Sequence, residues 1–156
     1  MPKKTSIQIP LQIIDLHEDG FHPLVEITVF DANFILVLDT GASKTAFDHD
    51  TLKEINKSAI TLSDRLSTGL GTNSMVSSTA IIHDLYIGEL LIPELEVAVL
   101  DLSAINIAYR QLGHPEVLGV LGSDVLMNYS AVINYGKQML TLRNRGKQAY
   151  KVLKTS

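Results

Sequence analysis

The sequence predicts an all-β protein with one or two short helices, and three observations lead to this fold class. Apolar and polar residues alternate along much of the chain with a period of two, which is typical of half-buried strands. Turn-forming residues interrupt the alternating stretches. No internal repeat, linker or change in composition divides the chain. We therefore expect residues 1–156 to form a single domain.

The composition excludes several classes of protein. With 46% hydrophobic and 19% charged residues among 156, the chain is typical of a folded domain and not of a disordered one. Its formal charge of −4 argues against a nucleic-acid partner, which would require a basic face. The absence of cysteine excludes a disulfide scaffold, a cysteine-ligated zinc site and a thiol nucleophile. No apolar run is long enough for a secretory signal or a membrane span, so we expect a cytoplasmic protein without a membrane partner.

The N-terminal part of the chain predicts an edge strand followed by a hairpin. Ile7, Ile9, Leu11 and Ile13 fall on one face of an alternating strand. Pro10 lacks a backbone donor, which places this strand at a sheet edge or at an interface. We then expect a hairpin connection over residues 17–23 and a strand over residues 24–30. A tight turn at 31–33 and a buried strand over 34–38 should follow.

A helix is expected over His49–Asn56, because Asp48 can cap its N-terminus and Asp50 adds negative charge to its first turn. Strands are expected again from residue 61 to residue 100, with breaks at 69–73 and near 88–89. The last third of the sequence predicts a loop with one helical turn over residues 103–116 and a short helix over residues 123–127. A hairpin over residues 131–143 should turn at 136–137.

The most informative segment is Asp39-Thr40-Gly41-Ala42-Ser43, which follows the apolar strand 34–38. An ionised carboxylate is costly to bury without a partner. Asp39 at the end of a buried strand therefore indicates either the cap of a turn or a carboxylate with a chemical role.

Residues 38–43 resemble the active-site loop of retropepsin-like aspartic proteases. Residues 119–126 resemble the two hydrophobic residues and glycine that precede a short helix in that family. Residues 68–73 lie where the family carries its glycine-rich flap, and residues 131–142 resemble its closing strands. The similarity extends from about residue 24 to residue 142, with the motifs in the family's order.

The resemblance implies a closed or partly open acid-protease β-barrel with one lobe per chain. It also implies an aspartic endopeptidase in which two carboxylates share a proton, so that one activates water while the other polarises the scissile carbonyl. The chain has a single Asp-Thr-Gly triplet. An active enzyme would therefore be a homodimer that acts on a peptide or protein substrate, with Asp39 contributed by each subunit.

Individual roles follow from the same resemblance. Asp39 would be catalytic, Thr40 would bond across to the partner's loop, and Gly41 would let backbone approach the substrate. Ala42 and Ser43 would line the cleft wall. The expected flap and substrate-binding residues are Gly69, Leu70 and Gly71.

The sequence differs from retroviral members of the family at one pair of positions. Those members carry an aspartate–arginine ion pair where this chain has Ser43 and Ser123, so the pattern is closer to cellular and bacterial relatives.

Other functions have weaker support in the sequence. The histidines show no paired metal spacing, and residues 69–71 lack the third glycine of a dinucleotide fingerprint, so we expect neither a metal nor a cofactor. An ordinary hairpin turn is the alternative for residues 69–71. For the whole chain, the alternative is a non-catalytic retropepsin-like module that binds peptides or has a regulatory role.

Overall fold

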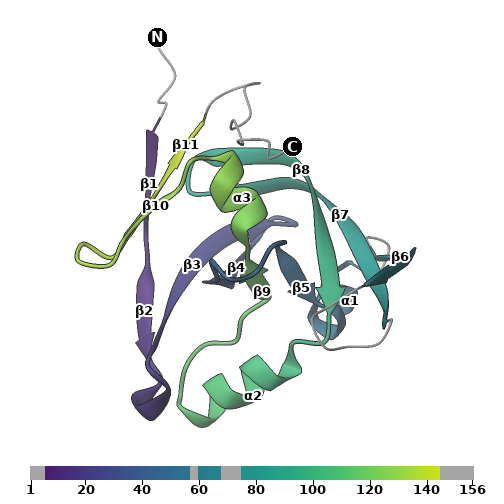
Figure 1. Cartoon of the computed structure of the whole chain (residues 1–156), viewed down its shortest axis with the longest axis horizontal. Helices are drawn as coiled ribbons and strands as arrows, with labels where there is room; N and C mark the ends of the chain where they lie inside the picture. The colour runs from purple at the N-terminus through teal and green to yellow at the C-terminus, as the bar shows by residue number, and fades with distance from the viewer. Residues whose placement is uncertain (1–5, 57–59, 68–74, 145–156) are drawn as a thin grey trace, which may run out of the picture.

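The computed structural model of the chain describes residues 6–56, 60–67 and 75–144 (Figure 1). The strands are β1 (Ser6–Pro10), β2 (Gln12–Asp15), β3 (Phe21–Val29), β4 (Ala32–Leu38), β5 (Ala46–Asp48), β6 (Ile60–Ser67), β7 (Met75–Ile87), β8 (Leu90–Leu100), β9 (Gly119–Leu121), β10 (Val132–Asn134) and β11 (Met139–Arg143). The helices are the short 3-10 helix η1 (His17–Asp19) and the α-helices α1 (His49–Asn56), α2 (Ser103–Gln111) and α3 (Ser123–Asn128).

The larger sheet closes on itself as a mixed β-barrel. Its strands follow the order β2-β3-β4-β9-β5-β8-β7-β6, and an additional pairing of Thr28 on β3 with Tyr86 on β7 joins the ends of the six central strands. Closure removes most of the exposed sheet edge. The predicted all-β class and the closed barrel are therefore confirmed.

Strand β9 lies between β4 and β5, although it comes much later in the chain. It runs parallel to β4, with Val37 opposite Val120, and antiparallel to β5, with Phe47 opposite Gly119. The loop that leaves β4 at residue 39 and enters β5 at residue 46 therefore passes over the C-terminal end of β9.

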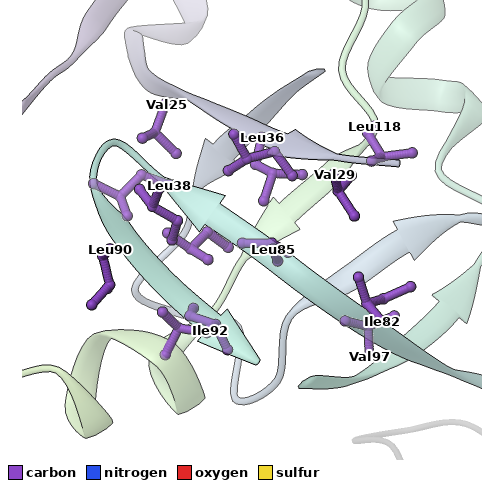
Figure 2. Close-up of a cluster of buried hydrophobic side chains, with 14 of the residues drawn as sticks. Val25, Val29, Leu36, Leu38, Ile82, Leu85, Leu90, Ile92, Val97 and Leu118 are labelled. Atoms are coloured by element: carbon purple, nitrogen blue, oxygen red, sulfur yellow. The ribbon is translucent and has the colours of Figure 1, made fainter. Parts of the chain in front are cut away.

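Strand alternation divides the core into two clusters of buried side chains. Leu36 and Leu38 face the larger cluster, where Figure 2 shows them with Leu85 from β7. Val37 faces the opposite way and joins a smaller cluster with Tyr109 of α2 and other residues. Because successive side chains of a strand alternate, Asp39 falls on the same face as Val37.

A second sheet of three strands has the order β1-β11-β10. The sequence predicts one continuous strand over 7–13, but the chain breaks at Leu11, whose N–H bonds to the carbonyl of Gln138 at 2.9 Å. The chain thereby passes from the smaller sheet into the barrel, and Ile14 is buried more deeply than Ile13. The expectation that the Pro10 strand lies at an edge is confirmed.

The prediction of a loop with one helical turn over residues 103–116 is wrong in its first part. Residues 103–111 form α2 over nine residues. Asn106 explains the difference, because its side chain donates to the carbonyl of Val117 at 3.0 Å and accepts from the N–H of Val117 at 2.8 Å. These contacts come from outside the helix, so helical periodicity could not reveal them.

Other boundaries agree more closely with the sequence. The helix over His49–Asn56 is confirmed with both its ends. The turn predicted at 31–33 is centred on Phe30 and Asp31, which adopt φ values of 53° and 58°. The final hairpin is also confirmed. Within the described ranges, no helix is both long and apolar enough to cross a membrane.

Candidate active site

Asp39 stands directly after β4, and its backbone continues the pairing of that strand with β9. Its N–H bonds to the carbonyl of Leu121 at 3.0 Å, and its side-chain Oδ1 accepts the N–H of Gly41 at 2.9 Å. The carboxylate therefore caps the turn that it begins. This local role is compatible with a chemical role, because the half-buried side chain keeps a second oxygen.

The five predicted loop residues lie together on one turn. Thr40, Gly41 and Ser43 are exposed, and Ala42 is half-buried. Gly41 does not adopt a positive φ; a Cβ there would lie 3.3 Å from Asp39 Oδ1, closer than such atoms usually approach. The predicted flap residues Gly69, Leu70 and Gly71 lie outside the described residues.

A network of hydrogen bonds fastens the loop to the start of α3. The buried Thr45 donates to Asp124 Oδ1 through its N–H at 3.0 Å and through its hydroxyl at 2.8 Å. The same hydroxyl accepts the N–H of Gly122 at 3.0 Å. Asp124 Oδ1 also accepts the N–H of Val125 at 2.9 Å. One carboxylate oxygen thus holds two segments that are 79 residues apart.

Ser123 adds a second connection between these segments. Its N–H bonds to the carbonyl of Ala42 at 2.8 Å, and its hydroxyl donates to the carbonyl of Ser43 at 3.3 Å. The two serines that stand where retroviral proteases have an ion pair are therefore joined through hydroxyl and backbone atoms.

Gly119 and Gly122 are required by the close approach of the loop and β5. A Cβ on Gly122 would lie 2.7 Å from the carbonyl carbon of Lys44 and 2.9 Å from the carbonyl oxygen of Ala42. A Cβ on Gly119 would overlap the carbonyl of Ala46 and lie 2.9 Å from the Cα of Phe47. These neighbours are backbone atoms, which cannot move aside as a flexible side chain can.

Sequence reasoning identified the glycine motif but missed Thr45 and Asp124 as residues that position the loop. Neither stands in a local pattern that would reveal its partner, because the bond between them depends on the threading of β9 between β4 and β5. The available signal was a small hydroxyl residue shortly after the Asp-Thr-Gly triplet and an acid shortly after the later glycine.

Lys44, on the same loop, forms an ion pair with Glu96 of β8 at 2.6 Å. Both side chains are well exposed, so the pair contributes little to stability.

The comparisons with known proteins agree with this geometry. Residues 25–125 match the family described as Aspartyl protease. Since this match covers more than half of the sequence, the chain belongs to the aspartyl protease family. The matched range contains the Asp39 loop, β9 and the start of α3. No curated protein sequence matches the chain.

Solved structures with the same fold include a retropepsin-like aspartic protease from Rickettsia conorii. It is 16% identical over 91% of this chain and 96% of its own, with a TM-score of 0.50. The retroviral protease-like domain of Ddi1 from Leishmania major is 17% identical over 78% of this chain and 87% of its own, with a TM-score of 0.51. At these identities the similarity establishes the retropepsin-like fold alone.

Proposed function

We propose that the protein is an aspartic endopeptidase whose two catalytic carboxylates are Asp39 from each subunit of a homodimer. The observation that carries this proposal is the position of Asp39. It stands at the end of a buried barrel strand, on a loop held by Thr45, Gly122 and Asp124 while the loop's own surface is open. Such a rigid support is what precise placement of a catalytic group requires.

The proposed chemistry needs no further group. Two close carboxylates cannot both ionise, so the pair holds one proton. The ionised carboxylate takes a proton from a water molecule, whose oxygen attacks the peptide carbonyl carbon. The protonated carboxyl donates its proton to the carbonyl oxygen. The carboxyl group that took the proton from water then donates it to the leaving nitrogen as the C–N bond breaks. The other carboxylate takes a proton from a hydroxyl of the intermediate, so the pair again holds one proton.

Several features support assembly of two chains. The chain carries one Asp-Thr-Gly triplet, so a second carboxylate must come from elsewhere. Thr40 and Gly41 are exposed in the single chain. Met127, Val132 and Tyr135, which lie within nine residues of sequence, are 48%, 60% and 59% exposed. Contact with a second chain would remove the apolar surface of these side chains from water. Two copies related by a twofold axis would present the same residues to one another.

Digestion of a diverse peptide library tests the proposal. We expect wild type to make internal cuts between pH 4 and pH 8, and Asp39→Asn to make none while it keeps the wild-type fold. Asp31→Asn is the matched control, because it makes the same exchange at the exposed turn before β4. Asp31 and Asp39 lie at opposite ends of this strand.

Sedimentation of wild type and both variants completes the experiment. A monomer that cuts peptides would contradict the shared pair of carboxylates, and so would an Asp39→Asn variant as active as wild type. A dimer without any cuts would instead favour a peptide-binding module with the same fold.

A further inference from the structure

A cavity separates helix α2 from the segment that joins β2 to β3. It has a volume of about 330 Å³, within the range of small ligand sites. The walls are mainly apolar and include Leu16, Ile105 and Leu112. Ala104 and Ala108, one turn apart on α2, also line the cavity, and their small side chains leave room that larger residues would fill.

The inner wall of the cavity carries a fixed hydrogen bond. Tyr109 is only 2% exposed, and its hydroxyl lies 2.6 Å from Nδ1 of His22. Burial raises the pKa of Tyr109 to about 12, so the phenol keeps its proton at neutral pH. No other bond of this hydroxyl is found among the described residues, and a buried O–H needs an acceptor. We therefore assign the proton to the tyrosine and the acceptor role to Nδ1.

This assignment leaves a donor on His22. A neutral imidazole that accepts at Nδ1 carries its proton on Nε2. Within the described chain, Nε2 of His22 has no partner, although the residue lines the cavity. The cavity therefore offers an N–H group suited to a peptide carbonyl.

The rim of the cavity carries a free carboxylate. Asp19 lines the cavity, and in the described part of the chain its side chain makes no hydrogen bond or ion pair. Glu18, the preceding residue, adds a second exposed negative charge. An apolar cavity with a negative rim is complementary to a long side chain that has a hydrocarbon stem and a cationic head.

We propose that this cavity binds an arginine side chain of a peptide segment. The stem of the arginine would lie against Ala104, Ala108 and Leu112, while its guanidinium group would pair with Asp19. His22 Nε2 would donate to a backbone carbonyl of the bound peptide, which favours a peptide over a simple amine.

The cavity adjoins the smaller buried cluster, to which Val37 also belongs. Tyr109 belongs to the buried cluster of Val37, on the side of β4 toward which strand alternation directs Asp39. A segment held in the cavity therefore lies on the same side of the sheet as the proposed active site. The binding itself does not depend on cleavage.

The test measures binding to the full chain carrying Asp39→Asn, so that no peptide is cut. The probes are blocked peptides Gly-Ser-X-Ser-Gly, in which X is arginine, citrulline or norleucine. Titration followed by NMR gives a Kd for each peptide and identifies the residues that respond. We expect responses at Ala104, Ala108 and Leu112, and a Kd for the arginine peptide about threefold to fivefold below that for citrulline, as for an exposed ion pair.

Three further variants in the same background make the test specific. Asp19→Asn should remove the preference for arginine over citrulline, whereas the neighbouring Glu18→Gln should keep most of it. Ala108→Trp should fill the cavity and abolish binding of all three peptides. Ile107→Trp is its control, since Ile107 is 51% exposed on the same helix and does not line the cavity.

Equal Kd values for arginine and citrulline would overturn the proposal, as would binding that survives Ala108→Trp or responses confined to residues away from α2. Because the protein tested carries no catalytic carboxylate, these outcomes leave the proposed peptidase activity to be judged by its own digestion experiment.

Discussion

At Gly119 and Gly122 the absence of a Cβ allows two backbone segments to touch. A Cβ on Gly122 would lie within 3 Å of backbone atoms in the loop between Asp39 and β5, and a Cβ on Gly119 would lie within 3 Å of backbone atoms of β5 itself. The requirement is for space, since neither residue adopts a positive φ. These residues hold the chain in the arrangement that carries Asp39, without taking part in any chemistry.

Gly119→Ala should lower the free energy of unfolding by about 3 kcal/mol, because the methyl group forces β5 away from β9. Urea unfolding measures this change. Gly136→Ala is the control: a Cβ there meets only the side-chain oxygen of Asn134 at 3.4 Å, an ordinary contact. If both variants unfold at the same urea concentration, the close approach at Gly119 does not constrain the fold.

Thr45→Val should destabilise the protein by about 2–4 kcal/mol, because it leaves the Gly122 N–H without an acceptor and removes one donor to Asp124 in a buried site. Thr45→Ser keeps the hydroxyl and should cost about 1 kcal/mol for the lost methyl group. Thermal unfolding compares the two. Equal losses would mean that the methyl group, rather than the hydrogen bonds, accounts for the contribution of Thr45.

The sequence reveals Asp39 as a site residue but does not reveal Thr45, and both outcomes have one physical reason. Asp39 is unusual in its own neighbourhood, as a carboxylate at the end of an apolar strand. Thr45 and Asp124 are ordinary residues where they stand, and they acquire their role only when β9 enters the barrel. The role of Thr40 at a dimer axis and the roles of Ala42 and Ser43 in the cleft wall remain predictions.

Among the elements, helices α1 and α2 begin at a common carboxylate. Asp48, which is 5% exposed, accepts the N–H and hydroxyl of Thr51 through Oδ2 and the N–H of Leu102 through Oδ1. The first pair of bonds is the cap predicted for α1. The third bond joins the same residue to the start of α2.

Asp48→Ala should lower the free energy of unfolding by about 2–3 kcal/mol, through loss of the cap and of an acceptor for the Leu102 N–H. Amide hydrogen exchange should accelerate at the starts of both helices. Asp101→Ala is the control, because the exposed Asp101 accepts from Ser103 alone among the residues that the structure describes, and its effect should be slight. Faster exchange in α1 alone would show that the bond to Leu102 does not hold α2.

The two helices also show where prediction from sequence succeeds at this scale. Helix α1 is predicted correctly because its cap is the residue just before it. Helix α2 is missed because Asn106 and Tyr109 are buried by partners elsewhere, at Val117 and His22. The split of the first strand at Leu11 likewise depends on a distant residue, Gln138.

For the whole molecule, burial of tyrosines should make stability fall at alkaline pH. Burial raises the pKa of Tyr109 from 10 to about 12, and burial also raises the pKa of Tyr129. Between pH 10 and about pH 12 the native chain keeps a proton on Tyr109 that the unfolded chain has lost. The contribution of the protonated Tyr109 to the free energy of unfolding is therefore complete below pH 10 and declines as the pH rises toward 12.

Tyr109→Phe should reduce the loss of stability across this range and remove the last phase of tyrosinate absorbance in an alkaline titration. Tyr135→Phe is the control, since Tyr135 is 59% exposed. A titration in which all tyrosines ionise together, in a protein still folded, would contradict the burial of Tyr109.

The insertion of β9 between β4 and β5 also has a consequence for the order of events during folding. Pairings across such long stretches of chain form slowly, because a large loop must close first. During synthesis, the strand bearing Asp39 emerges long before residues 119–124, which complete the support of its loop. A nascent chain therefore has no organised Asp39 loop until most of the barrel has been made. If the protein is a peptidase, this delay protects the growing chain from premature activity.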